Sequence, residues 1–81
     1  MKITMRYFGP AREALGIQGE EIELSDSATV GDLKSFLRAE KRGLATLLPS
    51  VRIAVGNAYV RDDHELVEGD EAAVIPPVAG G

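Results

Sequence analysis

Gly80 and Gly81, the last two residues of the sequence, have the types and position best suited to a chemical reaction. Glycine has no Cβ, so an extended Gly-Gly segment can pass through a channel too narrow for any other residue. It also leaves a terminal carboxylate on Gly81 unhindered, so that this group can attack the α-phosphate of ATP. The acyl adenylate so formed is an acyl donor, which a sulfur or amine nucleophile can intercept.

The diglycine follows a stiff segment of Pro76, Pro77, Val78 and Ala79. Proline in the polyproline II conformation loses little entropy on docking and rises ~3.1 Å per residue. Residues 76–81 can therefore reach about 20 Å at full extension, enough to place a carboxylate deep inside another protein. We expect a folded domain at residues 1–75 and an extended tail at residues 76–81 that threads into a partner.

The rest of the sequence offers no comparable reactive group. His64, the one histidine, lies among carboxylates in a turn-like stretch and is best explained as a solvated loop residue. The serines lack a nucleophile motif, the absence of cysteine excludes thiolates, and the aspartates of residues 62–70 do not match a calcium loop. We therefore expect no catalytic side chain, no metal and no bound cofactor in the chain itself.

Composition and charge describe one small acidic domain. The chain has 81 residues and a net charge of -4, while residues 61–81 carry six acidic residues and one basic residue, or -5. Such acidity disfavours nucleic acid and anionic lipid, and it favours either a basic protein surface or simple solubility. No apolar run approaches the ~20 residues of a membrane span, and the N-terminal residues do not resemble a signal peptide. We expect a cytoplasmic protein.

Alternating apolar and polar residues predict strands along most of the chain. The first strand places Ile3, Met5 and Tyr7 on one side, and Phe8 falls on the opposite parity. The last strand is almost continuously apolar, which is typical of a central strand covered on both faces. The predicted strands are residues 2–8, 20–24, 51–55, 58–60 and 71–75, with a tight turn at residues 56–57.

One amphipathic helix is predicted between the second and third strands. Thr29 is a good N-cap, and Asp32 gives the start the form of a capping box. Lys41 and Arg42 suit the last turn of this helix, and Gly43 suits the left-handed residue after it. The apolar stripe consists of Val30, Leu33, Phe36 and Leu37. Shorter helical pieces are predicted at residues 11–15 and 44–48.

This order of elements predicts an α+β fold, the β-grasp arrangement of ubiquitin: a mixed sheet of about five strands covered on one face by one main helix. In that topology the first and last strands are parallel neighbours, so Phe8 and Ile75 fall at the edge where the tail leaves. A large exposed aromatic side chain there is best explained by a partner. The alternative is that the strand ends or bulges before Phe8 and the ring turns into the core.

Four motifs give the whole chain a resemblance to the small subunits of molybdopterin synthase, a family of ubiquitin-like sulfur carriers. They are Tyr-Phe-Gly-Pro-Ala-Arg-Glu at 7–13, Thr-Val-Gly-Asp-Leu at 29–33, Glu-Gly-Asp-Glu at 68–71, and Pro-Pro-Val-Ala-Gly-Gly at 76–81. The last is the most specific, since Gly-Gly alone is a weak signal.

The resemblance implies a cycle of sulfur transfer. An E1-like activating enzyme, which uses ATP, adenylates Gly81, and a sulfurtransferase persulfide converts it to a thiocarboxylate. The tail, threaded through Gly80, enters the active site of a large subunit and donates sulfur to cyclic pyranopterin monophosphate. The family assembles as two large and two small subunits. Phe8 and Ile75 correspond to its apolar contact with the large subunit, although Ile75 stands where an aromatic residue is common.

Three alternatives remain compatible with the same residues. The chain could supply sulfur to thiazole or cysteine synthesis, since the tail chemistry is shared. It could be a protein modifier that joins its tail to lysines of target proteins. It could also be a plain β-grasp binding module whose tail has no reaction to perform.

Overall fold

The computed structural model describes residues 1–76, so the predictions for residues 77–81 lie outside the described part. The described part contains two helices and five strands, with two short 3-10 turns before the third strand. The elements are β1 (Lys2–Tyr7), α1 (Gly9–Leu15), β2 (Gly19–Glu23), α2 (Val30–Glu40), η1 (Arg42–Leu44), η2 (Leu48–Ser50), β3 (Arg52–Val55), β4 (Ala58–Tyr59) and β5 (Glu71–Ile75).

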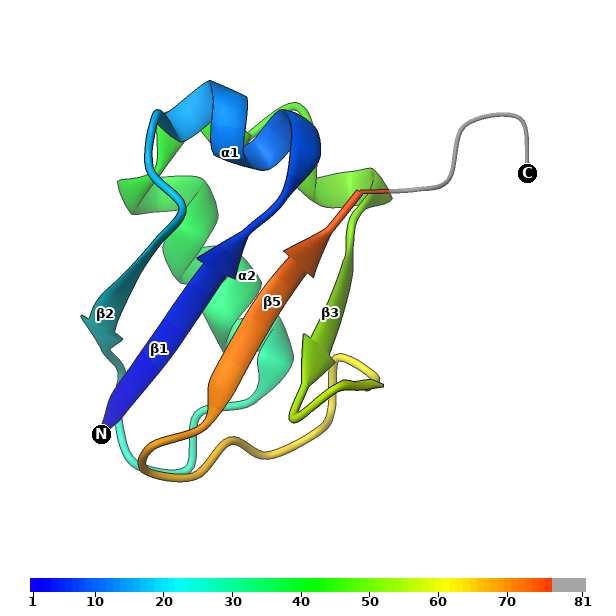
Figure 1. The fold of residues 1–81 in the computed structure, drawn as a ribbon. Helices are drawn as coiled ribbons and strands as arrows, with labels where there is room; N and C mark the ends of the chain where they lie inside the picture. The colour runs from blue at the N-terminus through cyan, green and yellow to red at the C-terminus, as the bar shows by residue number, and fades with distance from the viewer. Residues whose placement is uncertain (77–81) are drawn as a thin grey trace.

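The strands form one mixed sheet in the order β2-β1-β5-β3-β4, with α2 packed across one face (Figure 1). β1 and β5 are parallel neighbours at its centre, and the other pairs are antiparallel. The register pairs Thr4 with Glu71 and Tyr7 with Val74, so both strands end at the same edge. The predicted α+β sheet with one main covering helix is therefore confirmed.

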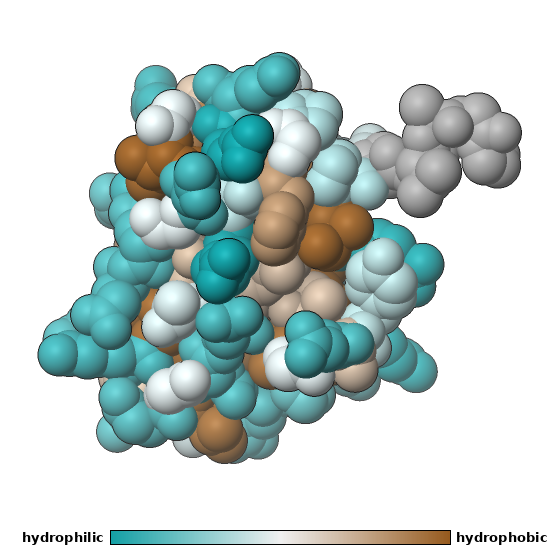
Figure 2. Space-filling view, in the orientation of Figure 1, coloured by the Kyte–Doolittle hydropathy of each residue, from teal (hydrophilic) through white to brown (hydrophobic). Residues whose placement is uncertain are grey.

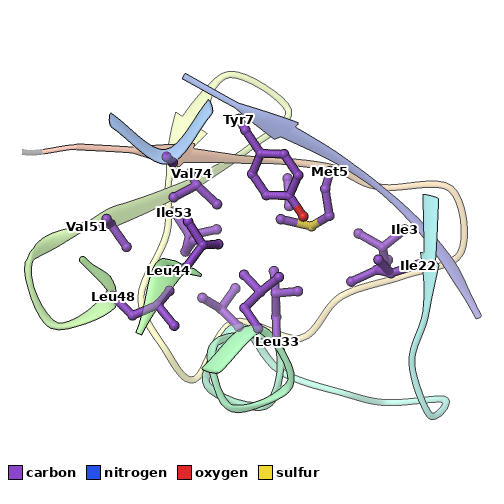
Figure 3. Close-up of a cluster of buried hydrophobic side chains, with 14 of the residues drawn as sticks. Ile3, Met5, Tyr7, Ile22, Leu33, Leu44, Leu48, Val51, Ile53 and Val74 are labelled. Carbon is purple, nitrogen blue, oxygen red and sulfur yellow. The ribbon is translucent and has the colours of Figure 1, made fainter. Parts of the chain in front are cut away.

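Side chains from the helix-facing side of the sheet form the core with α2 (Figure 3). Ile3, Met5 and Tyr7 are buried, as the alternation predicts. Val30, Leu33 and Leu37 meet them from α2, while Phe36 is only half-buried and packs against the cluster. Leu44, Leu48, Val51 and Leu66 close the core from the connecting segments.

The start of α2 follows the prediction. The backbone N–H of Asp32 donates to the Thr29 hydroxyl at 3.2 Å, and the Thr29 N–H donates to the Asp32 carboxylate at 2.9 Å. These reciprocal bonds satisfy two donors that a helix start otherwise leaves open.

The predicted end of α2 was wrong. The helix ends at Glu40, and Lys41 caps it with a φ of -117°, so neither Lys41 nor Arg42 belongs to its last turn. Gly43 lies within η1 and is not among the residues with positive φ. Its small size serves packing instead, because a Cβ there would lie 3.1 Å from the Ala14 carbonyl oxygen of α1.

The segment before β3 also differs from the prediction. Residues 44–48 do not form one helical piece; the turns η1 and η2 lie on either side of residues 45–47. Pro49 lies in the first turn of η2, where its fixed φ is favourable, so it begins a turn rather than ending one.

The face of β5 turned away from α2 is not covered by the described residues, contrary to the prediction. Ala72 and Val74 point into the core, whereas Ala73 and Ile75 on the outer face are only half-buried. The sequence of β5 is almost continuously apolar because Ala73 and Ile75, on the outer face, are apolar even though they are partly exposed to solvent. This exposed strip leads along the sheet to the start of the tail.

An acidic loop of residues 62–70 closes the opposite edge of the sheet (Figure 1). The Gly69 N–H donates to the Lys2 carbonyl, and the Leu66 N–H donates to the Ala28 carbonyl, both at 2.9 Å. Leu66 is buried at 2% exposure and anchors the loop in the core. Within residues 1–76, no helix combines the length and the apolar character needed to cross a membrane.

Candidate functional site

An open groove lies on the outer face of the sheet, beside the end of β5, and we call it the tail-root groove. Its volume is about 320 Å³. It is lined by Arg6, Phe8, Ala54, Asn57, Tyr59, Glu71, Ala73 and Ile75. Figure 2 shows apolar side chains gathered over this part of the sheet, framed by hydrophilic ones.

Phe8 forms one end of the tail-root groove. β1 ends at Tyr7, and Phe8 is the N-cap of α1 with an extended backbone (φ -126°, ψ 153°). The strand thus ends before Phe8, yet the ring does not enter the core and remains 43% exposed. The exposure predicted from the parity of Phe8 is confirmed, and its role in binding a partner stays a prediction.

Ile75 and Pro76 form the root of the tail. Ile75 pairs across the sheet with Arg52 of β3 and is half-buried, as is Pro76. The Cγ atom of Pro76 lies 3.3 Å from the position that a Cβ would occupy on Gly9, at the start of α1. Phe8 and Ile75 therefore lie at one edge, as predicted, with the proline root beside them. The other predicted tail residues, Pro77, Val78, Ala79, Gly80 and Gly81, lie outside the described part of the chain.

The far wall of the groove comes from the β3–β4 hairpin, which sequence analysis did not connect with the site. Gly56 (φ 58°) and Asn57 (φ 69°) both have positive φ, as a two-residue type I′ turn requires. The turn pairs Ala54 with Tyr59, so that both face the groove. Tyr59 is 56% exposed, and the Arg52 guanidinium lies 4.3 Å from its ring centroid. The parity of Tyr59 relative to the Gly-Asn turn was the signal that could have identified it.

The charges around the groove are balanced rather than acidic. Arg6 and Glu71 face each other at 3.8 Å, and both side chains are about half exposed, so water weakens their attraction. The acidic loop of residues 62–70 ends directly before Glu71, at the end of the groove that lies farthest along β5 from Ile75. The acidity of the last third of the sequence therefore does not surround the tail root.

A polar network of Tyr7, Glu20 and Lys41 lies at the end of β1. The Tyr7 hydroxyl donates to Glu20 at 2.6 Å, and the Lys41 ammonium donates to the other Glu20 oxygen at 2.8 Å. Burial alone would raise the pKa of Glu20, but the hydrogen bonds from Lys41 and Tyr7 and the charge of Lys41 hold it below its ordinary value. Burial, followed by the bond to Glu20, raises the pKa of Tyr7. The end of β1 is thereby tied to β2 and to the cap of α2.

The titratable side chains of the described residues do not gather in the groove, apart from Arg6, Tyr59 and Glu71. Among residues 1–76, no three histidine, aspartate or glutamate side chains are grouped to hold a metal ion. His64 is exposed in the acidic loop and does not line the groove.

Comparison with known proteins identifies the family of this chain. The sequence matches the ThiS family over residues 5–81. The chain belongs to the ThiS family. A molybdopterin synthase sulfur carrier subunit from Chlamydomonas reinhardtii is 36% identical to it over the full length of both chains. Small archaeal modifier protein 3 from Haloferax volcanii is 37% identical, also over the full length of both.

Solved structures agree with the fold of this ThiS-family chain. A protein from Pyrococcus furiosus, described as molybdopterin converting factor subunit 1, superposes with a TM-score of 0.87 at 33% identity, over 96% of this chain and 99% of that one. Subunit 1 in a complex of subunits 1 and 2 of the Helicobacter pylori molybdopterin-converting factor gives 0.75 at 26% identity, over the whole of both chains. A ubiquitin from Caldiarchaeum subterraneum, at 24% identity and 0.68 over 100% and 98%, shows the shared β-grasp fold. The resemblance found in the sequence motifs is therefore confirmed.

Proposed function

We propose that this chain is the sulfur-carrier small subunit of molybdopterin synthase. The observation that carries the proposal is the path of β5. This central strand ends at Ile75, which lines an exposed, largely apolar groove, and Pro76 follows it directly. Full-length relatives named sulfur carrier subunits, and a solved complex of a similar subunit 1 with its subunit 2, support the same function.

The chemistry proposed for Gly81 divides into three steps. An E1-like enzyme binds ATP and joins the Gly81 carboxylate to AMP, with release of pyrophosphate. The terminal sulfur of a persulfide on a sulfurtransferase then displaces AMP and forms an acyl disulfide between that enzyme and Gly81. A second thiol of the sulfurtransferase cleaves this S–S bond, which leaves an enzyme disulfide and releases the carrier with a thiocarboxylate. In the large subunit this sulfur passes to cyclic pyranopterin monophosphate, and two transfers build the dithiolene of molybdopterin.

The chain itself contributes the sulfur donor and a docking surface. The catalytic side chains belong to the large subunit, and ATP belongs to the activating enzyme, so this chain needs no cofactor of its own. Phe8, Ile75 and Tyr59 would contact the large subunit while residues 76–81 enter its active site. The assembly would contain two large and two small subunits and would work in the cytoplasm, where ATP is available.

Intact mass spectrometry of the chain isolated from cells with an intact sulfur supply tests the proposal. A fraction heavier by one sulfur-for-oxygen exchange, located on Gly81 by fragmentation, is the expected result. Removal of Gly81 should abolish this species without changing the melting temperature, because we expect the folded domain to comprise residues 1–75. A chain that carries only a carboxylate, even after incubation with the activating enzyme, ATP and a sulfur source, would contradict it.

A second function, protein modification, is favoured by the 37% identity to small archaeal modifier protein 3. The activated Gly81 would then acylate a lysine amine of a target protein, with release of AMP. Blotting the same cells for this chain separates the two functions. Species larger than the free chain, lost on removal of Gly81, would establish modification, whereas molybdopterin formed from the thiocarboxylated chain and the large subunit would establish sulfur transfer.

A further inference from the structure

Gly9 lies against Pro76, at the root of the tail, and the absence of a Cβ on Gly9 leaves room for the proline ring. A Cβ on this residue would lie 3.3 Å from the Cγ of Pro76 and would meet no other described atom within 4 Å. That separation is shorter than ordinary van der Waals contact between carbons. The Pro76 ring therefore packs on the bare Cα of the first residue of α1.

The backbone at Gly9 also requires glycine. Its φ is +54°, in the left-handed region that other L-residues adopt at a cost. Pro10 follows it and disfavours the right-handed helical conformation for the residue before it. The Gly-Pro pair thus turns the chain from Phe8 into α1 and, in the same turn, leaves an open place for the Pro76 ring.

We propose that Gly9 is a positioning residue for the C-terminal tail. Its contact with Pro76 holds the first residue beyond β5 in place, and this position would favour presentation of the diglycine to the enzymes that act on it. The proposal rests on the sulfur-carrier function for its biological meaning, but the contact itself can be tested without that function. A tail that starts in a fixed direction loses less entropy when it enters a partner.

Gly16, the C-cap at the other end of α1, provides a matched control. Its φ is +73°, so alanine there meets the same kind of backbone strain, but no described atom lies within 4 Å of the position of its Cβ. Gly9→Ala and Gly16→Ala should therefore lower the melting temperature to a similar extent. Only Gly9→Ala should disturb Pro76.

Steady-state adenylation of the purified chain by its E1-like enzyme separates positioning from folding. Gly9→Ala should raise the KM for the chain about tenfold and leave kcat almost unchanged, because the misdirected tail enters less often but reacts normally once bound. Gly16→Ala should leave both constants at the wild-type values. Equal KM values for the two variants would overturn the proposal.

A double-mutant cycle with Pro76→Ala tests whether the effect passes through the ring. Replacement of Pro76 removes the atom that the new Cβ would meet, so Gly9→Ala should raise KM by no more than roughly twofold in that background. If the full rise persists without the proline ring, Gly9 acts by another route and the proposal fails.

Nuclear magnetic resonance of the free chain tests the contact without any enzyme. The expected results are a nuclear Overhauser contact between Gly9 Hα and Pro76 Hγ, and amide residual dipolar couplings at Val78 and Ala79 that change in Gly9→Ala but not in Gly16→Ala. Couplings that average to zero in the wild type, or that are the same in Gly9→Ala as in the wild type, would overturn the positioning role. If the wild-type chain were never adenylated, the proposed function would fail while this measurement still decided the role of Gly9.

Discussion

The two edges of the sheet are built in opposite ways. At the acidic-loop edge, the chain uses its own polar groups: the Lys2 N–H donates to Glu68 at 3.0 Å, and the Val67 N–H donates to Asp70 at 2.9 Å. At the tail edge, Phe8 and Ile75 present apolar surface to solvent. The loop edge pairs backbone N–H groups with its own carboxylates, although Val67 there is 60% exposed, whereas the tail edge groups Phe8 and Ile75 along one groove that another molecule could bury.

This difference separates stability from binding. A buried anchor at the loop edge should matter for folding alone, and an exposed side chain at the tail edge should matter for association alone. Substitutions at the two edges should therefore affect one property each, and a substitution that affects both would break the comparison.

The largest expected effect is on stability, from Leu66→Ala. The side chain is 2% exposed and fills the core beneath the acidic loop, so its truncation should cost about 2–5 kcal/mol of unfolding free energy. Urea denaturation measures this loss, and Val67→Ala, at a neighbouring side chain that is 60% exposed, should change it by less than about 0.5 kcal/mol. Affinity for the large subunit, measured where the variant is folded, should be unchanged.

Phe8→Asp should have the converse effect. Loss of the exposed ring should weaken association with the large subunit by about 2 kcal/mol or more, the scale of an interface hot spot. The melting temperature should hardly change, since surface substitutions usually stay within about 0.5 kcal/mol. Calorimetric titration against the large subunit, with thermal melting, measures both quantities.

Ile17→Asp is the matched control for Phe8→Asp. Ile17 is 39% exposed, close to the 43% of Phe8, but it does not line the tail-root groove. It should bind with wild-type affinity. A sharp fall in melting temperature for Phe8→Asp would instead mean that the ring supports the core.

Glu20→Gln should give the smallest effect, one that depends on pH. The folded state holds the pKa of Glu20 below its unfolded value, so the charged network stabilises the protein above pH 4.5 and loses this contribution as the pH falls through the lowered pKa. The variant should be less stable by about 1–2 kcal/mol at pH 7, and this difference should narrow in acid. Chemical denaturation at several pH values measures it.

Glu21→Gln serves as the control here, because it removes the same charge from an exposed neighbour on β2. Its stability should follow the wild type at every pH. A difference between wild type and Glu20→Gln that stays constant from neutral to acid pH would show that the network contributes by packing and not by charge.

Local patterns were enough to predict most of the fold. The alternation of Ile3, Met5 and Tyr7 specified the buried face of β1, and Thr29 with Asp32 specified the start of α2, because both signals lie within a few residues. Phe8 could be identified in advance for the same reason, since parity alone placed it outside the core.

The failures involved contacts between distant segments. The sequence predicted Gly43 as a helix terminator. In the fold, its lack of a Cβ makes room for the carbonyl oxygen of Ala14, which is distant in sequence. Tyr59 was missed because its part in the groove depends on the pairing of β3 with β4 and then with β5. The sequence gives the negative charge of the last third correctly. Only the topology shows that the acidic loop of residues 62–70 precedes β5, at the opposite end of this strand from Ile75.

The β3–β4 hairpin has an evolutionary consequence. The wall that it gives to the groove stands at the margin of the sheet, where Ala58 and Tyr59 bury no side chain in the core. Position 57 is held to residues that accept positive φ, whereas no core packing constrains the side chain at position 59. A substitution at position 59 can therefore alter the wall of the groove between lineages without repacking the core or the central strand.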